Sequence, residues 1–211
     1  MATETSRREQ RRRRHQALSQ EQLLDAAEEV FGRKGYHDAT LKEVAELAEF
    51  SVGSVYSFFE NKEDLFRQIF VRRGTDFVQG LRAVLDAATT PLEQLHAVVD
   101  FEVGWFRAHP TFGRLYLRHA NATLLLSDDD LDAAVHDNYS EVMQMQADLI
   151  ARGQARKVLR SGDPVVLARL LSGLMSAYQA LDPVVASGGL DHDERYPLTE
   201  LHDLVEATFR A

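Results

Sequence analysis

The sequence contains no cysteine, which excludes disulfide bridges and thiolate metal sites and favours a reducing compartment. We therefore expect a cytoplasmic protein. Only 5 prolines and 12 glycines occur among 211 residues, too few for a fibrous or low-complexity chain. Apolar runs stay short of the roughly 20 residues that span a bilayer. The arginines near the N-terminus are not followed by the apolar stretch of a signal peptide.

Basic residues are scarce in the second part of the chain. The net charge is −9, yet residues 1–73 carry 13 basic and 13 acidic side chains, whereas residues 74–211 carry 11 and 20. All the excess acid therefore lies in the C-terminal two-thirds. This asymmetry leaves one end of the molecule able to approach a phosphate backbone that the other end repels.

Helical periodicity covers most of the chain, and no alternating strand pattern is present. Thr40-Leu-Lys-Glu43 and Thr90-Pro91-Leu-Glu93 have the form of N-terminal capping boxes. Asn61 is expected to cap the helix that begins at Lys62, and Asp163-Pro164 opens a later helix. The expected helices span residues 20–32, 41–48, 52–58, 62 to the mid-80s, 91–108, 112–126, 127–152, 164–182 and 198–209. The sequence therefore predicts an all-α fold of about nine helices.

Residues 1–18 are polar, basic and aperiodic, and we predict a mobile arm that precedes a helix beginning at Ser19. Arginines occupy positions 7, 8 and 11–14. Two interpretations of the run Arg11 to Arg14 remain open. It is either a solvated tail or an arm that follows phosphates or enters the minor groove.

Three helices as short as 20–32, 41–48 and 52–58 are not stable alone, so they must share a small core. Its expected members are Leu23, Ala27, Phe31, Leu41, Val44, Ala45, Phe50, Val55 and Phe59. Two helices joined by a three-residue turn form a helix-turn-helix, in which the second helix enters the major groove of DNA. The alternative, an ordinary helical hairpin in a core, fits poorly because hydroxyls, glycine and tyrosine are unsuited to a buried helix.

The second short helix carries small polar side chains suited to DNA. Ser51 and Ser54 offer hydroxyls to phosphates or base edges, and Gly53 lets the backbone come close. Val52 is able to contact a thymine methyl group. These four residues are candidate DNA contacts.

Three further candidates flank them. We expect Tyr56 to pack its ring inward while its hydroxyl reaches a phosphate. Thr40 and Lys62 stand at helix N-termini, where backbone N–H groups also attract phosphate.

These residues resemble the TetR family of bacterial repressors over about 50 residues from Ser19 onward. The matching motifs are Gly35-Tyr36-His-Asp-Ala-Thr40, Val44-Ala45-Glu-Leu-Ala48, Ser51-Val-Gly53-Ser-Val-Tyr56-Ser-Phe-Phe59 and Asn61-Lys62-Glu63-Asp-Leu65. The resemblance implies a homodimer whose C-terminal domain binds a small molecule that releases the DNA. It also implies DNA contacts by Thr40, Ser51, Val52, Gly53, Ser54, Tyr56, Ser57 and Lys62.

On this basis we divide the chain into three parts. Residues 1–18 form the basic arm, residues 19–66 the DNA-binding domain, and residues 67–211 the ligand-binding and dimerisation domain. Two positions depart from the family pattern. Glu49 stands where the turn usually has glycine and would cost about 1–2 kcal/mol in a left-handed conformation. Phe58 replaces a residue able to hydrogen-bond phosphate.

Aromatic side chains, one histidine and one methionine on otherwise apolar helices are candidates for the ligand pocket. They are Phe101, Trp105, Phe112, Tyr116, His119, Met143 and Tyr178. Taken singly, each also fits a plain core position. An apolar or aromatic effector would suit them, and we expect no cofactor and no metal site.

The helices at 164–181 and 198–209 are apolar on more than one face. Core packing needs one face, so a second face indicates a partner, and the family resemblance implies a four-helix bundle between two subunits. The predicted dimer contacts are Leu167, Leu170, Leu171, Leu174, Leu201 and Val205.

The function predicted from these features is a ligand-responsive transcriptional regulator, a repressor that binds a palindromic operator as a homodimer. A small helical enzyme is disfavoured because the sequence has no zinc-protease, P-loop or dinucleotide-binding motif and no cysteine nucleophile. An architectural nucleoid protein would be strongly basic, and the pI of about 5.4 argues against it.

Overall fold

The computed structural model describes residues 2–125, 133–187 and 197–211, with side chains for 7–118, 135–186 and 197–211. The described residues form ten helices and no strand, so the all-α prediction is confirmed. They are α1 (Ala2–Asp38), α2 (Leu41–Leu47), α3 (Val52–Val55), α4 (Lys62–Ala87), α5 (Pro91–Ala108), α6 (Pro110–Leu125), α7 (Ala133–Ala155), α8 (Pro164–Leu181), α9 (Pro183–Ser187) and α10 (Leu198–Phe209). Two compact units, residues 1–70 and 71–211, divide the chain within α4.

Helix α1 is longer than predicted. It begins at Ala2, so the prediction that the backbone before Ser19 is irregular is wrong. Residues 2–18 contain neither proline nor glycine and are rich in arginine, glutamine and glutamate. Such residues extend a helix at little cost once a buried segment has nucleated it. The helix predicted to end at residue 32 continues to Asp38, with a kink at Gly35, where φ is 81° and ψ is 169°.

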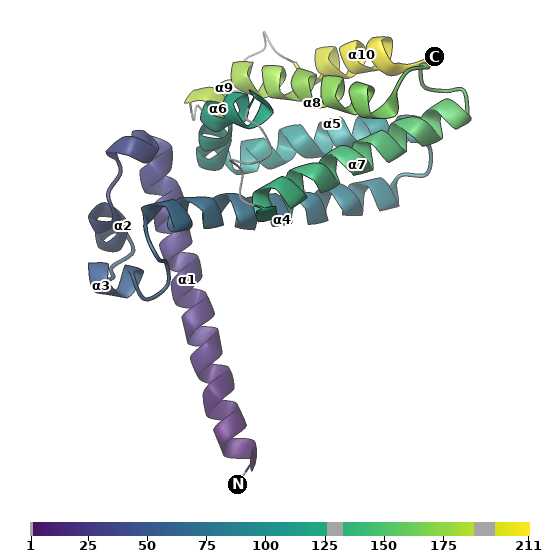
Figure 1. Cartoon of the computed structure of the whole chain (residues 1–211). Coiled ribbons are helices and arrows are strands. Elements are labelled where there is room, and N and C mark those ends of the chain that lie inside the picture. Colours follow the sequence, from purple (N-terminus) through teal and green to yellow (C-terminus); the bar gives the residue numbers. More distant parts are fainter. Residues whose placement is uncertain (1, 126–132, 188–196) are drawn as a thin grey trace. The chain divides into compact units, whose positions relative to one another are not determined.

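The first unit has the small core that the sequence predicts. Figure 1 shows α2 and α3 beside the C-terminal half of α1, while the N-terminal half extends beyond them. The buried members of the predicted core are Leu23, Ala27, Phe31, Val44, Ala45, Val55 and Phe59. Leu41 and Phe50 are half-buried at its edge. Helices too short to be stable alone are thus fixed against α1 by apolar contacts.

Local caps set the helix starts of the second unit. The Thr90 hydroxyl accepts a hydrogen bond from the Glu93 amide (3.2 Å), and the Glu93 carboxylate accepts one from the Thr90 amide (2.9 Å). Asp163 accepts hydrogen bonds from the amides at the start of α8. Helix α6 begins at Pro110 instead of residue 112. The predicted start of α7 at 127–132 lies outside the described residues.

Helix α9 is the one described helix that the sequence did not predict. Asp182 opens it, because its carboxylate accepts a hydrogen bond from the Val184 amide (3.0 Å). The same carboxylate pairs with Arg107 of α5 at 2.6 Å. This buried ion pair ties α9 to the end of α5, and the sequence spacing alone gives no sign of it.

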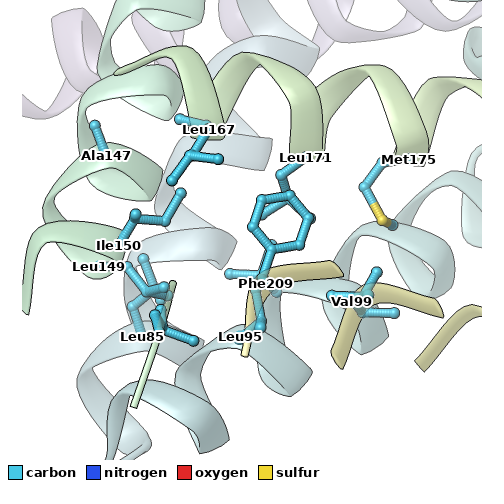
Figure 2. Close-up of a cluster of buried hydrophobic side chains, with 14 of the residues drawn as sticks. Leu85, Leu95, Val99, Ala147, Leu149, Ile150, Leu167, Leu171, Met175 and Phe209 are labelled. Atoms are coloured by element: carbon cyan, nitrogen blue, oxygen red, sulfur yellow. The ribbon is translucent and has the colours of Figure 1, made fainter. Parts of the chain in front are cut away.

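The core of the second unit gathers side chains from five helices. Figure 2 shows Leu85, Leu95, Ile150, Leu171 and Phe209 converging from α4, α5, α7, α8 and α10. By length and composition alone, α8 also satisfies the test for a membrane-crossing helix. Core helices of soluble proteins pass that test, and one face of α8 packs into this core.

Candidate functional site

The helix-turn-helix begins with a capping box at α2. The Thr40 hydroxyl accepts a hydrogen bond from the Glu43 amide (3.3 Å), and the Glu43 carboxylate accepts one from the Thr40 amide (3.0 Å). Lys34 of α1 pairs with the same carboxylate. Hydrogen bonds from Lys34, followed by those from Thr40, hold the pKa of Glu43 below its usual value. The start of α2 is therefore locked in place, with the Thr40 side chain exposed.

The turn after α2 places a glutamate in the left-handed region. Glu49 has φ 60°, its amide donates to the Glu46 carbonyl (3.3 Å), and the Phe50 amide donates to the Ala45 carbonyl (2.8 Å). These two bonds make a Schellman motif, which usually ends on glycine. Glu49, which the sequence predicted to be strained, does adopt the left-handed conformation. The turn therefore has the usual helix-turn-helix geometry, and the backbone strain at Glu49 lowers the stability of the unit.

Helix α3 is short and organised by hydroxyl groups. Ser51 caps it, accepting a hydrogen bond from the Ser54 amide (3.1 Å), and the two hydroxyls lie 2.8 Å apart. The Ser57 hydroxyl donates to the Ser54 carbonyl (2.6 Å). The helix itself spans Val52–Val55, but amide-to-carbonyl bonds of helical type continue to Phe59. The predicted helix over 52–58 thus exists as one helical turn followed by tighter turns.

The predicted DNA contacts share one side of this segment. Val55 and Phe59 are buried, whereas Ser51, Val52, Gly53 and Ser57 are exposed and Ser54 is half-buried. Tyr56 differs from expectation. Its side chain is 56% exposed, so the ring does not pack inward. Because Val55 and Phe59 already fill the inner face, Tyr56 is left on the outer face with both ring and hydroxyl available.

Lys62 opens α4 and is held against the end of α1. Its ammonium donates to the His37 carbonyl (3.1 Å) and lies 4.7 Å from the centre of the Tyr36 ring. The Asn61 side chain accepts a hydrogen bond from the Asp64 amide at 2.8 Å, as its predicted capping role requires. Phe58 is half-buried, in keeping with its lack of a polar group. Lys62 is thus a positioned cation with donors left for a phosphate.

In the second unit, most of the predicted pocket aromatics lie in one group. Trp105 packs edge-on against Phe112 (5.6 Å between ring centres), and Phe77 contacts both Phe101 and Trp105 (5.1 Å each). Tyr116 joins through Phe106 (5.3 Å) and Phe112 (6.3 Å). These rings come from α4, α5 and α6, and together they make an aromatic wall.

The other pocket candidates lie elsewhere. The Tyr178 hydroxyl accepts a hydrogen bond from Arg107 (3.3 Å), and Met143 is half-buried on α7. The side chain of His119 lies outside the described part of the structure.

A buried polar cluster adjoins the aromatic wall at Tyr116. The Glu102 carboxylate accepts a hydrogen bond from the Gln146 side-chain amide (2.8 Å), and both residues are almost fully buried. Burial raises the pKa of Glu102 to about 8, with the Gln146 hydrogen bond acting in the opposite direction. Burial, and then the nearby Glu102, raises the pKa of Tyr116 to about 12, although Ser176 hydrogen-bonds to it. Glu102 is therefore mostly a neutral acid at pH 7.

Comparisons with known proteins agree with the geometry of the first unit. The pattern of the family described as "Bacterial regulatory proteins, tetR family" matches residues 23–69, from the middle of α1 into α4. The TetR-family resemblance of the sequence is therefore confirmed for this unit.

Relatives extend this TetR-family likeness beyond the DNA-binding unit. The fatty acid metabolism regulator protein of Bacillus subtilis is 22% identical over 187 residues, covering 87% of this chain and 90% of the relative. The transcriptional repressor KstR2 of Mycolicibacterium smegmatis is 29% identical over 146 residues, 66% of each chain. The crystal structure of FadR from Bacillus subtilis with stearoyl-CoA has a TM-score of 0.71 at 19% identity, covering 88% of this chain and 95% of FadR.

The predicted dimer contacts divide into two groups. Leu167, Leu171, Leu201 and Val205 are buried within the core of the same chain. Leu174 is half-buried, and Leu170 is 59% exposed. The large apolar side chains that α8 and α10 leave exposed are Val165, Val166, Leu170, Leu181 and Leu204. The amphipathic pattern was thus recognised, but the sequence did not tell which side of each helix faces outward.

Glu102 and Gln146 were missed, although a signal was available. On α5, Leu95, Val98, Val99 and Val103 are buried, and Glu102 has the helical spacing of that set. On α7, Gln146 stands in the same way among buried Ala147, Leu149 and Ile150. Polar residues at inward positions of two neighbouring helices indicate a buried polar contact.

Proposed function

We propose that this TetR-family regulator is a cytoplasmic homodimer that represses transcription by binding a palindromic operator and is released by a small effector. The outward face of α3 is the observation that carries the proposal. It presents Ser51, Val52, Gly53 and Tyr56 on a unit whose other face is fixed by an apolar core. Ser57, Thr40 and Lys62 flank this face and supply hydrogen bonds to phosphate.

The exposed apolar side chains of α8 and α10 support the homodimer. Five large aliphatic side chains of these two helices are 48% to 59% exposed, and so many exposed apolar side chains are unusual on a monomer. A second copy would cover the same residues, giving an isologous interface. Two recognition helices would then face successive major grooves, which requires a palindromic site.

For the effector, the second unit offers an aromatic wall beside a polar cluster. We propose an apolar body that packs on Trp105 and Phe112, with a hydrogen-bonding group near Glu102 and Tyr116. A neutral Glu102 is able to donate as well as accept. Since FadR was crystallised with stearoyl-CoA, fatty acyl thioesters are the first ligands to test.

Selection of genomic DNA fragments by the purified protein tests the DNA-binding proposal. We expect enrichment of a palindromic sequence that outcompetes random DNA by 10³-fold or more at about 150 mM salt. Tyr56→Ala should weaken that binding at least about 10-fold without unfolding the unit, while Val158→Ala, an exposed change in the second unit, should not. Equal affinity for selected and random DNA would favour an architectural protein instead.

Titration of the protein–DNA complex with stearoyl-CoA, shorter acyl-CoA thioesters and free coenzyme A tests the effector. Release of DNA by thioesters but not by coenzyme A would support recognition of the acyl chain. Trp105→Ala should weaken this response, with operator affinity unchanged in the absence of ligand. If every apolar ligand leaves the complex intact, the effector part of the proposal is wrong.

A further inference from the structure

The N-terminal half of α1 carries a dense basic surface. Six arginines occupy positions 7, 8 and 11–14, and all side chains from Arg7 to Leu18 are exposed. Among the described residues, none of the ion pairs involves these arginines. Glu9, the one acidic residue between Arg7 and Arg14, offsets one of the six charges, so a strong net positive charge remains.

Helical geometry gathers most of these charges on one side. At 3.6 residues per turn, five of the six arginines fall within an arc of about 160°, and Arg13 points away from it. Arg7 and Arg11 lie one turn apart, as do Arg8 and Arg12. Like charges at this spacing oppose helix formation, so the segment would gain order from a polyanion.

Duplex DNA matches this surface better than a membrane does. Arg7 and Arg14 lie about 10 Å apart along the axis, a length over which duplex DNA carries about six charges. A helix that lies on a membrane needs an apolar face, and residues 2–18 contain only Ala2, Ala17 and Leu18 as apolar residues. The segment also belongs to the unit that contains the helix-turn-helix.

We propose that residues 7–14 of α1 bind the phosphate backbone of duplex DNA beyond the sequence contacted by α3. This inference rests on the proposed DNA-binding function. The half of α1 that extends past α2 and α3 (Figure 1) would lengthen the DNA footprint of the unit. Its contacts are with phosphates, so it adds affinity for all sequences and leaves the choice of operator to α3.

The salt dependence of DNA binding tests the proposal. The full chain and the variant Arg11→Gln/Arg12→Gln/Arg13→Gln/Arg14→Gln would be titrated with a selected fragment and a shuffled fragment from about 50 to 300 mM salt. For each arginine that contacts phosphate, the slope of log K against log salt should fall by about 0.9. Affinity should fall by the same factor for both fragments.

Two control variants separate charge from structure. The corresponding four-lysine variant keeps the charges and should keep most of the slope. Arg156→Gln/Lys157→Gln changes exposed charges of the second unit and should leave the slope unchanged. An unchanged slope in the four-glutamine variant would overturn the proposal. So would loss of sequence preference, or tighter binding to phosphatidylserine vesicles than to shuffled DNA. If no fragment is selected at all, the proposed repressor function fails, while the shuffled DNA still reports on the arginines.

Discussion

The two units use the same local devices for different ends. Each has a capping box, formed by Thr40 with Glu43 and by Thr90 with Glu93. Each ends a helix on a non-glycine residue with positive φ, Glu49 at 60° and Lys157 at 56°. In the first unit these devices fix the proposed DNA-binding surface of the helix-turn-helix, which lies within residues 40–62. In the second unit they fix only helix ends, and the candidate effector site consists of residues from helices that are far apart in the sequence.

The buried polar cluster illustrates this second mode. Glu102, Tyr116, Gln146 and Ser176 come from α5, α6, α7 and α8, and their approach depends on how those helices pack. A site of this kind tolerates changes in helix caps but responds to changes in the core. Matched substitutions in the two units therefore test whether changes in local structure and changes in helix packing have different effects on stability and binding.

The largest effect is expected at two neighbouring leucines of α8. Leu171 is fully buried, so Leu171→Ala should lower the free energy of unfolding by about 2–5 kcal/mol in chemical denaturation. Leu170 is 59% exposed, so Leu170→Glu should leave the protomer folded but convert dimers to monomers in sedimentation. A dimeric Leu170→Glu protein would remove the proposed interface, and a stable Leu171→Ala protein would contradict the core assignment.

These leucines also mark what was predictable from the sequence. Helix caps depend on residues within five positions of one another, and they were predicted at Thr40, Asn61, Thr90 and Asp163. The inward side of α8 depends on which helices surround it. The apolar residues Leu170 and Leu171 were therefore indistinguishable before the packing was seen. Asp182, which pairs with Arg107 across 75 positions, could not be foreseen for the same reason.

The second-largest effect is expected in how the free energy of unfolding depends on pH, because of Glu102. In the unfolded chain the pKa of Glu102 has its ordinary value of 4.5, whereas in the folded chain burial raises this pKa to about 8. Unfolding thus releases a proton between these values, and the free energy of unfolding falls as pH rises through that range. At pH 7 the loss is on the order of 3 kcal/mol.

Glu102→Gln removes this loss. We expect the variant to be more stable than the wild type at pH 7 and equal to it near pH 4, as measured by denaturation across that range. Glu46→Gln, an exposed control in the first unit, should keep the wild-type pH dependence. Parallel curves for the wild type and Glu102→Gln would show that burial of Glu102 does not set this slope.

The two capping boxes give a smaller and more discriminating comparison. Thr40→Ala and Thr90→Ala each remove one capping hydrogen bond, at a cost of about 1 kcal/mol. Only Thr40 belongs to the proposed DNA contacts, so only Thr40→Ala should also weaken binding of a selected DNA fragment. Thr→Ser at each position keeps the cap and serves as the control. Equal DNA affinity in both alanine variants would remove Thr40 from the interface.

The smallest effect is expected at the two left-handed positions. Glu49→Gly and Lys157→Gly should each relieve a strained backbone and raise the free energy of unfolding by about 0.5–1 kcal/mol. Glu49 is an exposed anion in the turn before α3, so its removal should also tighten DNA binding, whereas Lys157→Gly should not. Glu49→Gln tests the charge separately, because it keeps the strain but removes the anion. If Glu49→Gln and Glu49→Gly tighten binding equally, repulsion of phosphate explains the effect. If only the glycine variant does so, the backbone of the turn limits how α3 approaches DNA.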